Sequence, residues 1–318
     1  MTDKQINRWL RRRFSLVGWL LLGFYGLMTL MTAITVVTDT ARQYLWAFAA
    51  GDFSGSLDYD RITGNAWGYI VTILMGFALL DAWKGRNFWR QEVFHKESSM
   101  RIPTFLCMLC FCMGAQLISS LWISLLDLLM QPAGKSVMPV LEQVAGSSDT
   151  FSMFLYASIL APVWEELLFR GFVLRTLRPF GKRFSVFGSA VLFGLFHGNL
   201  LQAPYAVLMG FVMGYVAMEY SIGWSILLHM FNNLVLADLL TRLTANWSEM
   251  AYGSLNLLLF GGSALVSLVI LLRNRGRIRA YRKGEWMDRR CVKCFFLNSG
   301  ILALMIHMCI NMILVFSA

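Results

Sequence analysis

Residues 102–130 read IPTFLCMLCFCMGAQLISSLWISLLDLLM, and Asp127 is the only charged side chain in this run. A helix needs about 20 predominantly apolar residues to cross the hydrocarbon core of a bilayer. The run therefore predicts a membrane-spanning helix. It also indicates that lipid, rather than water, is the solvent around much of the chain.

The rest of the chain repeats this pattern. Of 318 residues, 57% are hydrophobic and 14% are charged, whereas roughly a quarter of the residues of a soluble domain are charged. Further apolar runs occupy 14–37, 66–83, 151–174, 184–200, 203–218, 223–243, 253–272 and 295–317, of which those at 66–83, 184–200 and 203–218 are short. We expect an all-α, polytopic membrane bundle of about nine (eight to nine) transmembrane helices.

The net charge of +10 follows the membrane topology. If the N-terminus lies inside, 23 of the 28 Lys and Arg residues fall in the inward segments 1–13, 84–101, 175–183 and 273–294. Cytoplasmic loops carry such an excess, so the pattern predicts a multi-pass protein of the cell membrane with a cytoplasmic N-terminus. No basic domain with interleaved aromatic residues accompanies the charge, which argues against nucleic-acid binding. The basic loop 273–294 fits either contact with the anionic inner leaflet or a simple stop-transfer anchor.

The six cysteines include two CxxC pairs, Cys107/Cys110 and Cys291/Cys294, which raise the question of a zinc site. The first pair lies inside an apolar run, where cysteine behaves as a small hydrophobic residue. We therefore expect no metal and no other cofactor.

Charged residues are costly inside a membrane span, yet the run 151–174 contains Glu165, Glu166 and Arg170. Glu166 and Arg170 are four residues apart, on one helical face, where they can form an ion pair. Glu165 is rotated by about 100° from Glu166 and has no local partner. The spacing predicts a structural role for Glu166 and leaves Glu165 free to act as a general base.

Three histidines lie in apolar runs, and two of them fit the depth of Glu165. From the inward ends of their runs, Glu165 is about 14 Å deep, His197 about 18 Å, and His229 and Asn233 about 9 and 15 Å. His229 and Asn233 are four residues apart and share a face. We expect the four side chains to share one cavity.

Such a set is suited to amide hydrolysis. Glu165 and His197 would hold a water between them, with Glu165 taking its proton as the water attacks the carbonyl. His229 and Asn233 would donate hydrogen bonds to the developing oxyanion. Glu166 and Arg170 would hold Glu165 in place.

The motifs Glu165-Glu166-x-x-x-Arg170, Phe193-x-x-x-His197 and His229-x-x-x-Asn233 resemble the three signatures of the CPBP family. This family comprises CAAX-type prenyl proteases and bacteriocin-processing or immunity (Abi) proteins. The resemblance implies a metal-independent glutamate endopeptidase within the membrane, with a core of four helices and a cavity open to the cytoplasm. It implies the same roles for the four catalytic candidates, with Phe193 in support.

The resemblance also suggests how the chain is divided. The expected segments are accessory helices at 1–150, a catalytic core at 151–240, and accessory helices at 241–318 that include the basic loop. Glu219 departs from expectation, because a neutral or basic residue is expected at that inward turn, and it bears on substrate access.

Alternatives stay open at this stage. His307 and Asn311 repeat the spacing of the third motif, either as oxyanion donors or as a staple for the last helix, and Asn232 adjoins Asn233. A zinc protease of the H-E-x-x-H type is disfavoured, since no Glu follows His197 or His229. A transporter and a non-catalytic scaffold, such as a bacteriocin-immunity protein, are the other candidates. The expected partners are the bilayer and a peptide or protein substrate, membrane-embedded or lipidated forms included. The sequence sets neither the substrate nor the oligomeric state.

Overall fold

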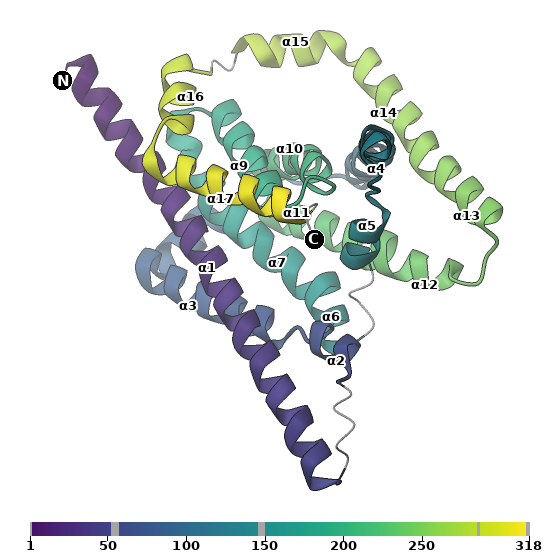
Figure 1. Cartoon of the computed structure of the whole chain (residues 1–318). Coiled ribbons are helices and arrows are strands. Elements are labelled where there is room, and N and C mark those ends of the chain that lie inside the picture. Colours follow the sequence, from purple (N-terminus) through teal and green to yellow (C-terminus); the bar gives the residue numbers. More distant parts are fainter. Residues whose placement is uncertain (1, 52–56, 146–149, 285–286, 316–318) are drawn as a thin grey trace.

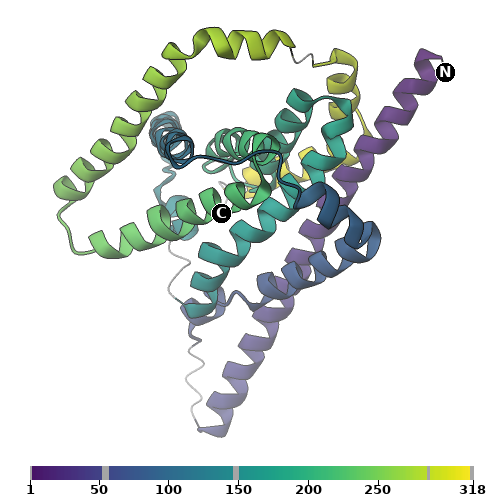
Figure 2. The same cartoon turned by 180° about the vertical axis from the view of Figure 1, so that it is seen from behind.

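The computed structural model describes residues 2–51, 57–145, 150–284 and 287–315 (Figures 1 and 2). Within these ranges every regular element is a helix and there is no strand. The expected all-α class is confirmed.

Six stretches in the described residues are long and apolar enough to cross a bilayer. The first is α1 (Asp3–Ala49), the second combines α2 (Tyr59–Thr63), α3 (Trp67–Phe88) and η1 (Trp89–Val93), and the third is α4 (Ile102–Met130). The fourth combines α6 (Phe151–Leu155), η4 (Tyr156–Leu160), α7 (Ala161–Glu166), η5 (Leu167–Val173), α8 (Leu174–Leu177) and η6 (Arg178–Phe180). The fifth combines α11 (Ile222–Met230), η7 (Phe231–Leu239) and α12 (Leu240–Thr244), and the sixth combines α13 (Glu249–Asn256), η8 (Leu257–Gly261) and α14 (Gly262–Arg273). A seventh is formed if α16 (Arg289–Phe296) and α17 (Ser299–Val315), bent by 59°, count as one span. Shorter helices are η2 (Gln131–Ala133), α5 (Met138–Ala145), α9 (Lys182–Phe196), α10 (Ala203–Glu219) and α15 (Arg275–Gly284). The helices indicate a multi-pass membrane protein.

Within the described residues, length and composition support six, or up to seven, of the about nine predicted spans, and the runs left over are the short helices α9 and α10. They contain 15 and 17 residues, which at 1.5 Å per residue gives about 22 and 25 Å, less than the roughly 30 Å of hydrocarbon. The two helices pack closely on each other, since a Cβ on Gly210 would lie 2.8 Å from the Ala190 Cα. A buried helix is as apolar as a spanning one, so hydropathy alone does not separate them.

The long helix α1 runs along one side of the molecule and packs against α3, α16 and α17 (Figure 1). Its crossing with α17 depends on two glycines. A Cβ on Gly18 would lie 2.2 Å from the Gly300 carbonyl carbon, and a Cβ on Gly300 would lie 2.0 Å from the Ser15 carbonyl oxygen. No other residue allows the two backbones to come this close.

The segment α7–η5 lies in the centre of the bundle. Leu168, Phe169, Phe172 and Val173 of η5 are completely buried. Helices α9, α10 and α11 contact this segment on one side, and α3 and η1 contact it on another. The charged motif of residues 165–170 therefore sits in the interior of the protein.

A cluster of ion pairs joins the loops at one end of these helices. Glu97 lies in the connection before α4, and its Oε1 is 2.8 Å from Arg178 Nη2 and 3.4 Å from Arg175 Nη1. Its backbone N–H donates to the Tyr220 carbonyl. Glu219, the residue that departs from the expected pattern, lies 2.6 Å from the Lys182 amine. Glu219 thus has a structural partner at the base of the α9–α10 hairpin.

The cluster predicts an acid-sensitive contribution to stability. Partial burial on its own would raise the pKa of Glu97, but the attraction of Arg178 and then Arg175 outweighs it and lowers the pKa below its ordinary value of 4.5. A carboxylate with a lowered folded pKa stabilises the fold above its unfolded pKa, and this contribution is lost as the pH falls through the folded value. We expect the Glu97→Gln protein to have a lower Tm than wild type at pH 7 and a smaller further decrease on acidification to about pH 3.

The measurement is thermal unfolding of purified protein at both pH values. Glu249→Gln, at an exposed glutamate of α13, serves as the matched control. Identical pH dependence in wild type and Glu97→Gln would contradict the assignment.

Candidate active site

The helix that carries Glu165 and Glu166 changes its winding on both sides of them. The short α-helix α7 lies between the π-helical segments η4 and η5. Pro162 has no N–H to donate, so the donor that would reach the carbonyl of residue 157 in π-helical winding, or of residue 158 in α-helical winding, is missing. Single π-helical turns inside α-helices are frequent at functional sites.

Glu166 is the centre of a buried polar network. Its carboxylate lies 2.9 Å from Arg170 Nη1 and 3.0 Å from His229 Nδ1, and it also accepts a hydrogen bond from the Ser225 hydroxyl. The side chains of Glu166 and Arg170 are both 0% exposed. The predicted ion pair between them is confirmed.

Arg170 depends on Glu166 for charge compensation. Its Nη1 is at ion-pair distance from the carboxylate, yet none of its three side-chain nitrogens makes a well-directed hydrogen bond in the described part of the chain. The guanidinium carbon lies 4.3 Å from the centre of the Phe193 ring, a cation–π contact. Phe193 thus covers the ion pair.

His229 joins the two glutamates. Its Nδ1 donates to Glu166, and its Nε2 lies 3.8 Å from a carboxylate oxygen of Glu165. The hydrogen bond to Glu166 fixes which ring nitrogen carries the proton in the neutral state. Glu165 is 23% exposed and stands at the edge of this network, whereas Glu166 is inside it.

His197 is oriented by a hydrogen bond within its own helix, and the Phe193 ring lies between it and His229. It caps the C-terminus of α9, and its Nδ1 lies 2.9 Å from the Phe193 carbonyl, which can only accept. Its Nε2 is therefore an acceptor in the neutral state. The Phe193 ring lies edge-on to both imidazoles, with centroids 4.9 Å from His197 and 5.8 Å from His229.

Asn233 contacts the helix of the glutamates at its irregular turn. Its side-chain amide donates to the Ala157 carbonyl at 3.0 Å, the carbonyl that Pro162 leaves without a donor in π-helical winding. Its amide oxygen accepts from Asn232, whose own oxygen accepts from Tyr205. Asn233 therefore joins η7 to η4.

The alternative pair His307 and Asn311 contacts α1. The two side chains contact each other at 3.3 Å, and the Asn311 amide donates to the Tyr25 hydroxyl of α1. The Tyr25 ring also packs edge-on against the His307 ring. These contacts join α17 to α1, in keeping with the staple role.

Sequence reasoning missed Ser225 and Tyr205. Ser225 donates to Glu166 and is four residues before His229, so its face on α11 was readable from the spacing. Tyr205 is 27 residues from its partner Asn232, and no local sequence pattern predicts that contact.

Residues 147–235 match the sequence model of a family described as Type II CAAX prenyl endopeptidase Rce1-like. This segment is an Rce1-like domain. The match is confined to this segment, and it agrees with the resemblance of its motifs to the CPBP family. No curated protein and no solved structure matches the chain.

The Rce1-like domain includes all seven predicted site residues, Glu165, Glu166, Arg170, Phe193, His197, His229 and Asn233. Among the described residues no group of three or more His, Cys, Asp or Glu side chains is arranged to hold a metal ion. The division into 1–150, 151–240 and 241–318 stays a prediction.

Proposed function

We propose that this protein is a metal-independent intramembrane endopeptidase that cleaves a peptide bond near the cytoplasmic side of the membrane. The contact set around His229 carries the proposal. One imidazole nitrogen is anchored by the buried Glu166, while the other lies 3.8 Å from the half-buried Glu165. The Rce1-like family match over the same residues supports it.

In the proposed mechanism Glu165 and His197 activate a water molecule. The Nε2 atom of His197 is free to accept because Nδ1 is used by the Phe193 carbonyl. A water can donate one hydrogen to this nitrogen and the other to the Glu165 carboxylate. As the water oxygen attacks the carbonyl carbon, Glu165 takes the proton, and it later delivers the proton to the leaving amine.

His229 and Asn233 are the proposed donors to the oxyanion. Since Nδ1 of His229 is used by Glu166, the imidazole must be protonated at Nε2 to donate to substrate. One N–H of the Asn233 amide is used by Ala157, which leaves the second for the oxyanion.

Replacement of Asn233 tests this role. We expect Asn233→Ala to lower kcat by about 10²–10³ with little change in KM, because an oxyanion donor acts in the transition state. Asn232→Ala should cost much less, since Asn232 bonds to Asn233 and Tyr205 and is not a proposed donor to the oxyanion. Steady-state kinetics of both purified variants gives the comparison, and equal losses would contradict the assignment.

The function itself is tested by finding a substrate. Membrane-fraction peptides from cells with wild-type protein are compared by mass spectrometry with those from cells with Glu165→Ala protein at equal expression. We expect a set of peptides with new termini in the wild-type sample only. If the two peptide sets were indistinguishable and the Glu165→Ala variant kept the wild-type phenotype, a non-catalytic role would be favoured.

A further inference from the structure

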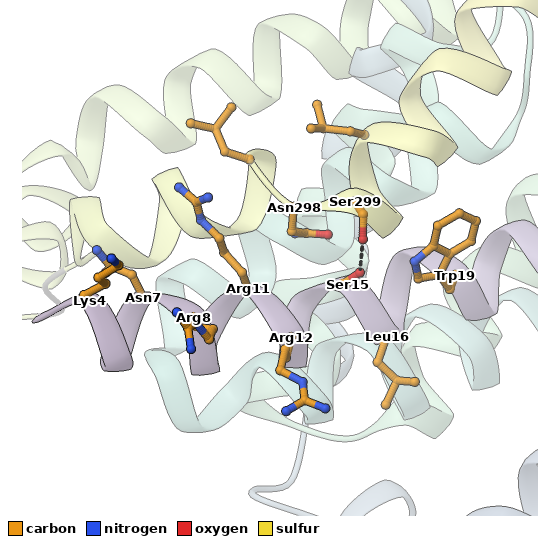
Figure 3. A pocket seen from close by; sticks show the side chains of 12 residues that line it. Lys4, Asn7, Arg8, Arg11, Arg12, Ser15, Leu16, Trp19, Asn298 and Ser299 are labelled. Atoms are coloured by element: carbon orange, nitrogen blue, oxygen red, sulfur yellow. Dashed lines mark hydrogen bonds between the residues drawn. The ribbon is translucent and has the colours of Figure 1, made fainter. Parts of the chain in front are cut away.

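An open hollow lies between the first turns of α1 and the break between α16 and α17, far in sequence from the Rce1-like domain (Figure 3). Its volume is 1010 Å³, at the upper end of the roughly 300–1,000 Å³ typical of small-molecule pockets. Four cations line it: Lys4, Arg8, Arg11 and Arg12.

These cations lie on one face of α1. Lys4, Arg8 and Arg12 are successively four residues apart, and Arg11 is three from Arg8, so their side chains are neighbours. In the part of the chain that the structure describes, none of the four forms an ion pair. The nearby Asp3 is paired with Arg290 at 2.9 Å. Like charges at this spacing repel one another, and a bound anion would relieve the repulsion.

Ser15, Asn298 and Ser299, which also line the hollow, are already used by the protein. Ser15 and Ser299 share a hydrogen bond between their hydroxyls at 2.9 Å, and the Gly300 N–H donates to Ser15. The Asn298 side chain is fully engaged with backbone groups of its own chain segment. The charged donors for an anion in the hollow are the four cations of α1, and the Asn7 amide lies beside them.

The same face of α1 becomes apolar farther along. Leu16 and Trp19 follow the cations, and Trp19 lies about 10 Å beyond Arg12 along the helix axis. Both are about half exposed, at 47% and 50%, and Leu302 of α17 borders the hollow beside them. Figure 3 shows the basic side chains along one half of this length of α1 and Trp19 at the other end.

The hollow thus has a basic end and an apolar end, and it lies where the charged start of α1 meets the apolar run 14–37. Tryptophan is enriched at this level of a membrane protein, the boundary between headgroups and acyl chains. A soluble phosphate would use only the basic end. A molecule with a negative headgroup and acyl chains matches both ends.

We propose that this hollow is a binding site for one anionic phospholipid, whose headgroup phosphate contacts Lys4, Arg8, Arg11 and Arg12 and whose acyl chains lie along Leu16, Trp19 and Leu302. Basic pockets between transmembrane helices bind such headgroups in other membrane proteins. The lipid would fill the space beside the tight α1–α17 crossing. This site does not depend on the proposed peptidase activity.

The test uses full-length protein reconstituted in nanodiscs with equal amounts of phosphatidylglycerol and phosphatidylcholine. Lipids that stay bound are counted by native mass spectrometry. The site variant carries Arg8→Gln, Arg11→Gln and Arg12→Gln. The matched control carries Arg275→Gln, Arg277→Gln and Arg279→Gln on the exposed basic helix α15, so both lose three positive charges.

Wild type and the α15 control should retain phosphatidylglycerol in preference to phosphatidylcholine. The site variant should lose this preference, with affinity for phosphatidylglycerol roughly 100-fold lower, given the contribution of each basic residue near an anionic surface. A milder double variant, Arg8→Gln with Arg12→Gln, is measured as well, in case the triple variant unfolds, and should lose most of the preference.

Three results would overturn the proposal. Retention by the site variants as in wild type would exclude the hollow, and equal losses in the site and α15 variants would indicate general attraction by charge. Displacement of phosphatidylglycerol by millimolar inorganic phosphate would show an anion site without lipid recognition.

Discussion

The Glu165→Gln protein should fold as wild type does and lose peptide cleavage by about 10²–10⁴-fold, the contribution of a positioned general base. Glutamine keeps the shape of glutamate but does not accept the proton of the attacking water. Glu165 is 23% exposed and lies outside the ion pair of Glu166 and Arg170, so its neutralisation leaves that pair intact. The free energy of unfolding should change by about 0.5 kcal/mol or less.

The assay measures cleavage of a peptide found by the proteomic comparison, in buffer with EDTA so that metal-dependent contaminants do not contribute. Glu249→Gln makes the same chemical change at an exposed position of α13 and should keep full activity. Cleavage by Glu165→Gln at the wild-type rate would remove Glu165 from the mechanism.

Glu166→Gln should be the most destabilising of these substitutions, at about 3–5 kcal/mol, the usual cost of breaking a buried ion pair from one side. The reason is Arg170, which is 0% exposed and has its ion-pair contact with Glu166. Arg290→Ala, which breaks the exposed contact with Asp3, should cost about 0–1 kcal/mol. The comparison is made by thermal or denaturant unfolding of wild type, Glu166→Gln and Arg290→Ala in the same detergent.

A double variant separates the structural role of Glu166 from its role in positioning His229. Replacing both charges, in Glu166→Gln with Arg170→Met, removes the uncompensated buried cation and should recover much of the stability. Activity should stay low, because the carboxylate that holds Nδ1 of His229 is absent. Recovery of stability and activity together would limit Glu166 to a structural role.

Local spacing in the sequence was enough to predict several features of the structure. The apolar runs predicted an all-helical membrane protein, and the four-residue spacing predicted the pair of Glu166 and Arg170. The three motifs predicted the family of the segment 147–235. These features are local because a helix brings residues four apart onto one face whatever its surroundings.

The structure supports six to seven of the about nine predicted spans, and the difference comes from the two short helices α9 and α10. In the runs at 184–200 and 203–218, Leu192, Phe193, Met209 and Met213 are buried against other helices, whereas Phe211 and Tyr215 of α10 are each 37% exposed. Hydropathy measures removal from water and does not distinguish lipid from protein as the surroundings. The assignment of α9 and α10 as spans therefore stays a prediction.

The sequence by itself determined which residues of each helix share a face: the ion pair within one helix, the common side of His229 and Asn233, and the row of cations at the start of α1. Only the tertiary structure decided which faces meet. It paired His229 with Glu166 across 63 residues, Asn233 with Ala157 across 76, and Ser15 with Gly300 across 285. The physical reason is that backbone geometry fixes contacts within a helix, whereas contacts between helices depend on how all the side chains of the bundle pack together.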